Sequence, residues 1–224
     1  MFAEDVADVL RRYADRYSRH GYHPLTLGWT KGRQQLRFAA ALEMLGQSFE
    51  SVLDVGCGFG DLFGYLWGLG WRGRYLGIDL VPELLEEGRR RYGPLGARFE
   101  RLDLTATDID FHADVAVAIG VFNHRLRQDN LAFFRQMLAA MWRHTTVAVT
   151  ADFLSATADR RRDDLFYAPV GEVVQAGLAL SKRVMLHHGY MPFEFNLTVW
   201  HDDSFTVEVP VFKPYLKYVV RDGS

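Results

Sequence analysis

The chain has 224 residues and a mass of 25.7 kDa, a length typical of one full domain with modest additions. With 26 basic and 28 acidic side chains the net charge is −2, which disfavours binding to nucleic acid or anionic membranes through bulk charge. The single cysteine, Cys57, excludes an internal disulfide framework and a cysteine-clustered zinc site. No secretory signal and no apolar run of about eighteen residues is visible, so we expect a soluble cytoplasmic protein.

Two helices are predicted ahead of the first strand. Apolar residues recur at helical spacing from Val6 to Tyr17, and Gly21 follows as a stop signal. A loop over 22–30 then leads into a second predicted helix over 31–45.

From Ser51 onward, short apolar runs alternate with helical stretches. Strands are predicted over 51–55, 74–79, 97–101, 114–119 and 145–150, and helices over 60–69, 82–91 and 128–142. The continuous hydrophobicity of the fourth run is typical of a strand buried on both faces of a parallel sheet. This alternation predicts βαβ units and a Rossmann-like, doubly wound α/β fold, a three-layer αβα sandwich.

Beyond Thr150 the pattern becomes irregular. The polar stretch Asp152–Pro169 is predicted to be a loop, and a loop of this length in a compact domain is typically a lid or a binding element. Its charge run over 160–164 favours a solvated face over an anion site.

The last part of the chain is predicted to complete the sheet. A helix over 170–180 precedes strands over 183–186 and 193–200, which we expect to form an antiparallel pair joined by a turn over 187–192. Residues 205–220 are β-prone but are interrupted by two prolines, which suits an edge strand or an excursion onto another surface.

The most informative stretch is a glycine-rich turn after the first predicted strand. Residues 52–60 read VLDVGCGFG, and such a turn lets the backbone approach a ligand at the carboxyl edge of the sheet. Compared with the dinucleotide pattern G-x-G-x-x-G, the third glycine, Gly60, comes one residue early and Asp61 takes the sixth position. Since an acid is unfavourable beside a pyrophosphate, the pattern argues against a dinucleotide.

Three acids follow successive predicted strands. Asp54 precedes the glycine turn and suits a ligand with an amine or cationic centre. Asp79 ends the second strand, where an acid can accept both hydroxyls of a ribose. Asp103 follows the third strand and can accept from an exocyclic amine, while apolar neighbours such as Leu104 flank a ring. A single aspartate at a strand end is weak evidence for a ligand site, because such residues often cap the next helix. Three of them in register with the glycine turn are much stronger evidence.

These motifs, residues 54–60 with Asp79 and Asp103, resemble the cofactor motifs of class I S-adenosylmethionine-dependent methyltransferases of a small bacterial type. The resemblance extends roughly from Ser51 to Trp200. It implies a seven-stranded sheet with an antiparallel last strand pair, S-adenosyl-L-methionine as cofactor and S-adenosyl-L-homocysteine as product. The cofactor residues expected on this basis, with Arg37 added from the second helix as a partner for the cofactor carboxylate, are Asp54, Gly56, Cys57, Gly58, Gly60, Asp79, Leu80, Asp103, Leu104, Gly120, Asn123 and Arg37.

Methyl transfer requires orientation and exclusion of water, and a hydroxyl acceptor also needs its proton removed. His124, which follows the fourth strand, is a candidate base, and a surface or helix-capping role is equally weighted. His188 and Glu194 are further catalytic candidates with competing structural roles, for Glu194 that of an outward-facing edge residue. We find no oxygen-ligand cluster and expect no metal.

The leading hypothesis is an O-methyltransferase acting on a small-molecule acceptor, such as a sugar or a secondary metabolite, as a monomer or homodimer without nucleic-acid or membrane partners. A non-catalytic S-adenosylmethionine-binding scaffold and an NAD-dependent oxidoreductase are the alternatives. The expected division is a helical lid over 1–47, a methyltransferase core over 48–201 whose loop over 152–169 faces the substrate, and a C-terminal β extension over 202–224.

Overall fold

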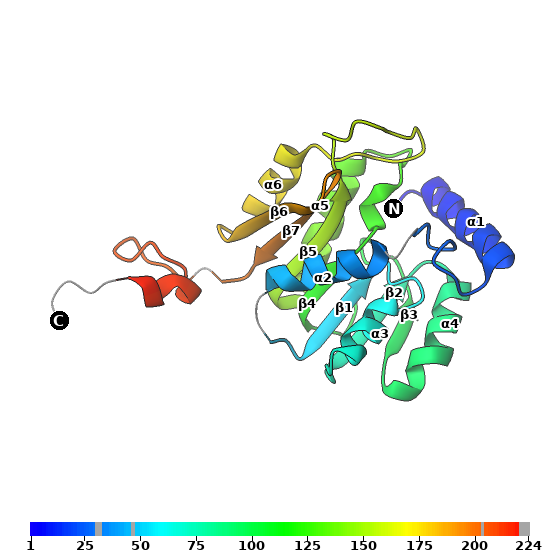
Figure 1. The fold of residues 1–224 in the computed structure, drawn as a ribbon, viewed down its shortest axis with the longest axis horizontal. Helices are drawn as coiled ribbons and strands as arrows, with labels where there is room; N and C mark the ends of the chain where they lie inside the picture. Colours follow the sequence, from blue (N-terminus) through cyan, green and yellow to red (C-terminus); the bar gives the residue numbers. More distant parts are fainter. Residues whose placement is uncertain (30–32, 46–47, 203, 220–224) are drawn as a thin grey trace.

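The structure of the protein is a computed structural model that describes residues 1–29, 33–45, 48–202 and 204–219. Within these residues the centre is a seven-stranded sheet in the order β3-β2-β1-β4-β5-β7-β6 (Figure 1). The strands are β1 (Ser51–Val55), β2 (Arg74–Asp79), β3 (Arg98–Arg101), β4 (Ala113–Ala118), β5 (Thr145–Leu154), β6 (Val184–Met191) and β7 (Glu194–Trp200). The first five strands run parallel, and β7 is antiparallel to both β5 and β6. The predicted Rossmann-like fold with an antiparallel last pair is confirmed.

Helices cover both faces of the sheet. They are α1 (Ala3–His20), α2 (Arg33–Leu45), α3 (Asp61–Gly68), α4 (Pro82–Tyr92), α5 (Asn130–Arg143) and α6 (Val170–Leu178). Alternate side chains of β1 enter opposite faces, because Leu53 belongs to a buried cluster with α5 and α6 and Val52 to one with α2, α3 and α4. Apolar burial on each face therefore holds the three layers together. None of these helices, as described, has both the length and the apolar character needed to cross a membrane.

The first helix lies outside the three layers, beside α4 (Figure 1). It ends as predicted at Gly21, whose φ is +58° and whose N–H donates to the Tyr17 carbonyl at 2.7 Å. The apolar face of α1 packs against Phe59, Val81 and Leu84; this face consists of Val9, Leu10, Tyr13 and Tyr17. The N-terminal helix is thus anchored at the segments that follow β1 and β2. The predicted start of the second helix, at Lys31, lies outside the described residues.

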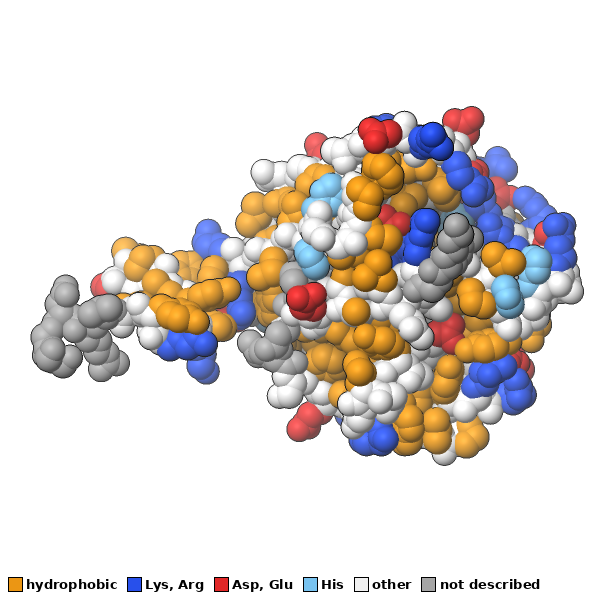
Figure 2. Space-filling model, in the orientation of Figure 1, with side chains coloured by type: hydrophobic (Ala, Val, Ile, Leu, Met, Phe, Trp, Pro, Cys, Tyr) orange, Lys and Arg blue, Asp and Glu red, His pale blue; other side chains and the backbone are white. Residues whose placement is uncertain are grey.

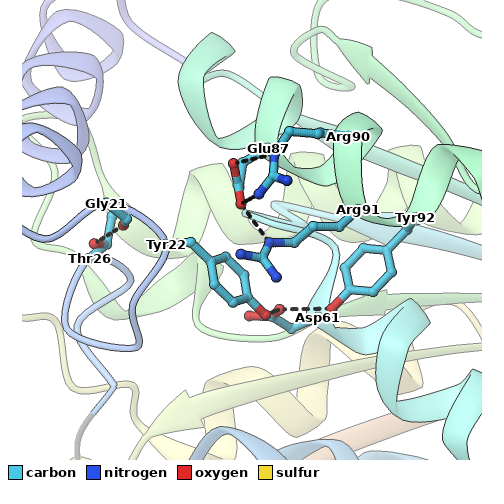
Figure 3. Close-up of polar contacts among 8 residues, drawn as sticks. All are labelled: Gly21, Tyr22, Thr26, Asp61, Glu87, Arg90, Arg91 and Tyr92. Atoms are coloured by element: carbon cyan, nitrogen blue, oxygen red, sulfur yellow. Dashed lines mark hydrogen bonds and ion pairs between the residues drawn. The ribbon is translucent and has the colours of Figure 1, made fainter.

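The loop after α1 is attached to the core by Asp61, the first residue of α3 (Figure 3). Oδ1 of Asp61 accepts a hydrogen bond from Oη of Tyr22 at 2.7 Å, and Oδ2 accepts one from Nε2 of Gln34 at 3.1 Å. Arg91 lies over the Tyr22 ring and is paired with Glu87 (Figure 3). Asp61, the residue that distinguishes this turn from the dinucleotide pattern, therefore connects the loop after α1, α2 and α3.

Two strands are longer than predicted. β5 continues past Thr150 to Leu154, because its pairing with β7 supplies hydrogen-bond partners after β4 ends at Ala118. β6 continues to Met191, so the turn comprises residues 192–193 and not the predicted 187–192. The longer β5 carries Asp152 into the sheet, although the sequence placed it in a loop.

The predicted C-terminal β extension is wrong for the residues that the structure describes. Residues 204–219 contain no strand, and a 3-10 helix covers Lys213–Tyr218. Pro210 and Pro214 each lack the N–H that a strand ladder needs. The segment projects away from the sheet (Figure 1), and Val207 is 91% exposed, so it buries little apolar surface.

We expect Gly56→Ala to destabilise the fold more than Gly70→Ala. Both glycines have positive φ, +67° and +91°, which an alanine adopts at a cost of about 1–2 kcal/mol. A Cβ at Gly56 would also lie 2.5 Å from Cγ2 of Val121, whereas nothing lies within 4 Å of a Cβ at Gly70. Crowding of this kind adds about 1–3 kcal/mol. Urea unfolding of both variants measures the difference, and equal losses would contradict the tight contact with Val121.

Candidate functional site

A cavity opens at the carboxyl ends of β1, β2 and β4, where open α/β sheets bind ligands. Its wall also includes side chains from α1, from the loop after α1 and from residues 162–165. All the predicted cofactor residues except Gly60 line this cavity: Asp54, Gly56, Cys57, Gly58, Asp79, Leu80, Asp103, Leu104, Gly120, Asn123 and Arg37.

The glycine turn brings bare backbone to the cavity. Gly56 and Gly58 have φ of +67° and +56°, a conformation that glycine adopts without a Cβ penalty. The N–H groups of Gly56 and Cys57 both donate to the carbonyl of Ile78, at 2.8 and 3.0 Å, and this ties the turn to β2. Gly60 lies behind the turn, where a Cβ would meet the Phe99 ring at 2.5 Å, so its position supports a packing role.

Asp79 holds the turn and still faces the cavity. Its Oδ2 accepts from the N–H of Gly58 at 2.8 Å and its Oδ1 from the N–H of Val81 at 3.0 Å. Burial raises the pKa of Asp79 although these hydrogen bonds act in the opposite direction. Because a carboxylate has about four acceptor sites, lone pairs remain for ligand hydroxyls.

Asp54 and Cys57 are buried groups at the end of β1. Asp54 is 4% exposed and accepts a hydrogen bond from Oη of Tyr75 at 2.5 Å, and burial raises its pKa to about 7. Burial also raises the pKa of the Cys57 thiol well above its usual value, so the thiol stays protonated at pH 7. A protonated thiol is a weak nucleophile, so Cys57 is not activated for covalent chemistry.

Asp103 lies on the loop after β3 and is partly buried. Its Oδ1 accepts from the N–H and the hydroxyl of Thr105, at 2.9 and 2.6 Å, and its Oδ2 accepts from the Met1 ammonium at 2.7 Å. Burial alone would raise the pKa of Asp103, but the ammonium and the Thr105 bonds outweigh it and lower the pKa. The carboxylate is therefore ionised, and one of its oxygens is paired with the chain's own Met1 ammonium. Binding of a ligand's exocyclic amine by Asp103 stays a prediction.

Arg37 of α2 is buried between two carboxylates, Asp152 of β5 and Glu194 of β7. Its Nε and Nη2 both donate to Glu194, and its Nε lies 3.1 Å from Oδ2 of Asp152. The guanidinium lies over the Trp29 ring, 4.2 Å from the centroid. Its Nη1 is buried and has no hydrogen-bond partner among the described residues. This donor at the cavity wall suits a ligand carboxylate.

His124 joins the N-terminal helix to the cavity. Its Nδ1 contacts Nη1 of Arg12, and its Nε2 lies 2.9 Å from Oη of Tyr13. Because a guanidinium only donates, Nδ1 is the acceptor, and Nε2 carries the proton of the neutral ring. Burial, reinforced by Arg12 and Arg16, lowers the pKa of His124 to about 4. The imidazole is therefore neutral at pH 7.

The other two catalytic candidates lie off the cavity wall. His188 is exposed on the edge strand β6, and its ring meets that of Phe195 edge-on. Glu194 is buried and bonded to Arg37, which is a positioning arrangement and not the outward-facing edge residue considered from sequence. Within the described ranges, no three His, Cys, Asp or Glu side chains are grouped so as to hold a metal ion.

Sequence reasoning missed two contributors to the site. Asp152 is 1% exposed and its Oδ1 accepts from the N–H of Gly120 at 2.6 Å; the available signal was an acid within the apolar run 147–153. Tyr13 was interpreted only as part of an apolar helix face. The sequence clue was Arg16, an arginine at the margin of that apolar face. In the structure both Tyr13 and Arg16 line the cavity.

Comparison with known proteins places these features in a family. Residues 52–144 match a family described as a methyltransferase domain. A putative methyltransferase of Mycobacterium tuberculosis, Rv1506c, is 33% identical over 166 residues, which cover 66% of this chain and 92% of that protein. The demethylmenaquinone methyltransferase of Deinococcus radiodurans is 37% identical over 146 residues, and the match covers 63% of this chain and 56% of the Deinococcus protein.

Solved structures share the fold at low identity. The magnesium protoporphyrin IX methyltransferase of Synechocystis PCC 6803 with bound S-adenosylhomocysteine has a TM-score of 0.62 and 13% identity, covering 88% of this chain and 99% of that one. DhpI in complex with S-adenosylhomocysteine has a TM-score of 0.63 and 18% identity, covering 88% and 97%.

The chain belongs to the class I S-adenosylmethionine-dependent methyltransferases. It is a methyltransferase, and its cofactor is S-adenosylmethionine. The residues present fit this cofactor, since buried carboxylates with free lone pairs, a bare glycine turn and the unpartnered Nη1 of Arg37 line one cavity.

Asp54 makes a prediction about pH. Its pKa is about 7 in the folded protein, against about 3.9 for an unfolded aspartate. Between these values the folded state binds more protons, so the contribution of Asp54 to the free energy of unfolding falls as the pH rises from about 4 to about 7. Asp54→Asn does not titrate, and we expect it to gain stability relative to wild type across this window.

Denaturant unfolding at stepped pH measures that difference, and Asp110→Asn, at an exposed position, controls for the loss of one negative charge. A difference between wild type and Asp54→Asn that does not change with pH would contradict the raised pKa.

Proposed function

We propose that this methyltransferase methylates a hydroxyl group of a small molecule, a sugar or a secondary metabolite, without a metal ion. The observation that carries the proposal is the neutral His124 at the cavity wall. An imidazole with a pKa of about 4 is neutral at pH 7, and its one lone pair, on Nδ1, faces Arg12. Once the guanidinium moves away, this nitrogen can take the proton of an acceptor hydroxyl as the oxygen reacts. A side-chain base makes a metal unnecessary for deprotonation.

The proposal assigns the cofactor contacts as follows. S-adenosylmethionine supplies a methyl group activated by the adjacent sulfonium. Asp79 accepts hydrogen bonds from the ribose hydroxyls, Asp103 and Leu104 bind the adenine, and Nη1 of Arg37 donates to the carboxylate. Support comes from the lone pairs left free on Asp79 and from the buried donor of Arg37. The glycine turn lies against the methionine part.

Two segments outside the sheet serve as the cover of the acceptor site in this proposal. Residues 1–47 contribute Tyr13, which bonds to His124 at 2.9 Å. The loop after β5 meets the same histidine, because Leu165 forms an isolated bridge with His124 and the N–H of Phe166 donates to the Asn123 carbonyl at 3.0 Å. In this proposal the two segments cover the reacting atoms and exclude water from them.

The cofactor assignment is tested by calorimetry with S-adenosylhomocysteine. We expect binding to the wild type and a loss of about tenfold to a hundredfold for Asp79→Asn, because part of the acceptor set for the ribose is removed. Asp110→Asn is the matched control and should bind like the wild type. Unchanged affinity in Asp79→Asn would contradict the ribose assignment. Binding without transfer of a labelled methyl group to any of a broad panel of hydroxylated acceptors would favour the scaffold alternative.

The base is tested with His124→Gln. We expect kcat to fall by about a hundredfold or more, since general-base catalysis contributes factors of about 10² to 10⁴. In the wild type, kcat/KM should be flat from about pH 5.5 to 8, because a base with a pKa of about 4 is already deprotonated there. His20→Gln, at an exposed position on α1, is the control. Retained turnover in His124→Gln, or a wild-type inflection near pH 6.5, would rule out this base.

A further inference from the structure

Positive charge gathers around His124. Arg12 contacts its Nδ1, and Arg16 and Arg162 stand close enough to help lower its pKa. Among the described residues that influence this pKa most, Asp164 alone raises it, and both of its oxygens already accept from Arg162 at 2.9 Å. Figure 2 shows Lys and Arg side chains gathered where α1 approaches the loop after β5.

Arg12 and Arg16 differ from the other arginines of α1. Arg11 and Arg19 each form a salt bridge with an aspartate of the same helix. Arg12 and Arg16, one turn apart and half-buried, form no salt bridge within the described part of the chain. Like charges at this spacing repel each other. Aspartates also line the cavity beside Arg12, but Asp8 is paired with Arg11 and Arg127, and Asp164 is paired with Arg162. Arg12 and Arg16 are therefore available to a ligand anion.

The two guanidinium groups flank the candidate base. Arg16 lines the cofactor cavity, and Arg12 lines a second cavity. His124 lies on the wall of both. The carboxylate of the cofactor is matched by Arg37, which reaches the cavity from α2 and not from α1. Arg12 and Arg16 are therefore left for the other substrate.

We infer that the methyl acceptor carries an anionic group, a carboxylate or a phosphate, near the hydroxyl that is methylated, and that Arg12 and Arg16 bind this group beside His124. The inference rests on the proposed function in placing the acceptor at this histidine. A guanidinium matches both anions through paired N–H donors. An anion that draws Arg12 toward itself also releases Nδ1 of His124, and this lone pair is then free for the hydroxyl proton.

The test uses three probes with one carbon skeleton: glycerol, glycerate and glycerol 3-phosphate. Each is titrated at constant ionic strength into protein saturated with S-adenosylhomocysteine, and binding is followed by shifts in the ¹H–¹⁵N NMR spectrum. We expect at least one anion to bind ten times more tightly than glycerol, with the largest shifts around Arg12, Arg16 and His124. The tighter of the two anions distinguishes a carboxylate from a phosphate. Neither anion binding more tightly than glycerol overturns the inference.

Variants locate the anion site. The double variant Arg12→Gln/Arg16→Gln should weaken binding of the preferred anion at least tenfold. The single variant Arg12→Gln, which changes a residue outside the cofactor cavity, should also weaken anion binding and leave the Kd for S-adenosylhomocysteine within about twofold. Arg19→Gln, whose guanidinium is 67% exposed on the same helix, should change neither. The two single variants repeat the test if the double variant does not fold. Unchanged anion affinity in every folded variant overturns the assignment to Arg12 and Arg16.

The cofactor assignment and the anion site are tested separately. If S-adenosylhomocysteine does not bind the wild type, the cofactor assignment fails, while titration of the three probes into the free protein still tests the anion site.

Discussion

Carboxylates buried at the carboxyl edge of the sheet are the constraint on which the rest of this structure depends. Asp54, Asp79 and Asp152 lie at or near the ends of β1, β2 and β5, and burial raises the pKa of each. A buried carboxylate is tolerated only where hydrogen-bond donors converge on it. The chain supplies these donors mainly from its own backbone, at Gly58, Val81 and Gly120. Two of these donors, Gly58 and Gly120, have φ of +56° and +80°, a conformation that glycine adopts without a Cβ penalty.

The cluster around Arg37 extends this arrangement to the far side of the cavity. One guanidinium is shared by Asp152 and Glu194, which connects α2 to β5 and β7. Removing one partner of a buried ion cluster leaves an uncompensated charge, which is costly in the fold. Arg37 therefore stabilises the position of α2, and through the contact with Trp29 it also positions the loop that precedes this helix.

What the sequence predicted correctly has a local origin. The strand before the glycine turn, the turn itself and Asp79 lie within one βαβ unit, and short-range hydrophobic periodicity and spacing are enough to identify them. The family resemblance then supplied the seven-stranded sheet and the cofactor. Gly60 shows the limit of this reasoning, because spacing alone does not distinguish a glycine on the cavity wall from one that makes room for Phe99.

What the sequence missed depends on contacts between distant residues. Arg37 and Glu194 are 157 positions apart, and the end of β5 is set by its pairing with a strand some forty residues later, so neither pattern is visible in a local window. The alternation of apolar and polar residues along β7 is compatible with an outward-facing Glu194. In the structure α2 packs against β7, and Glu194 is buried. The C-terminal segment is β-prone in sequence but forms no strand among its described residues. It contains two prolines, which interrupt strand pairing.

The hydrogen bond between Tyr13 and His124 spans 111 positions of the chain and joins a helix outside the sheet to the candidate base. In the proposed function, the sheet and its turns hold the cofactor, and this helix and the loop after β5 enclose the space beyond it. Under that proposal the two functions occupy different parts of the chain. The cofactor constrains the residues at the strand ends, and the choice of acceptor is left to the two segments outside the sheet.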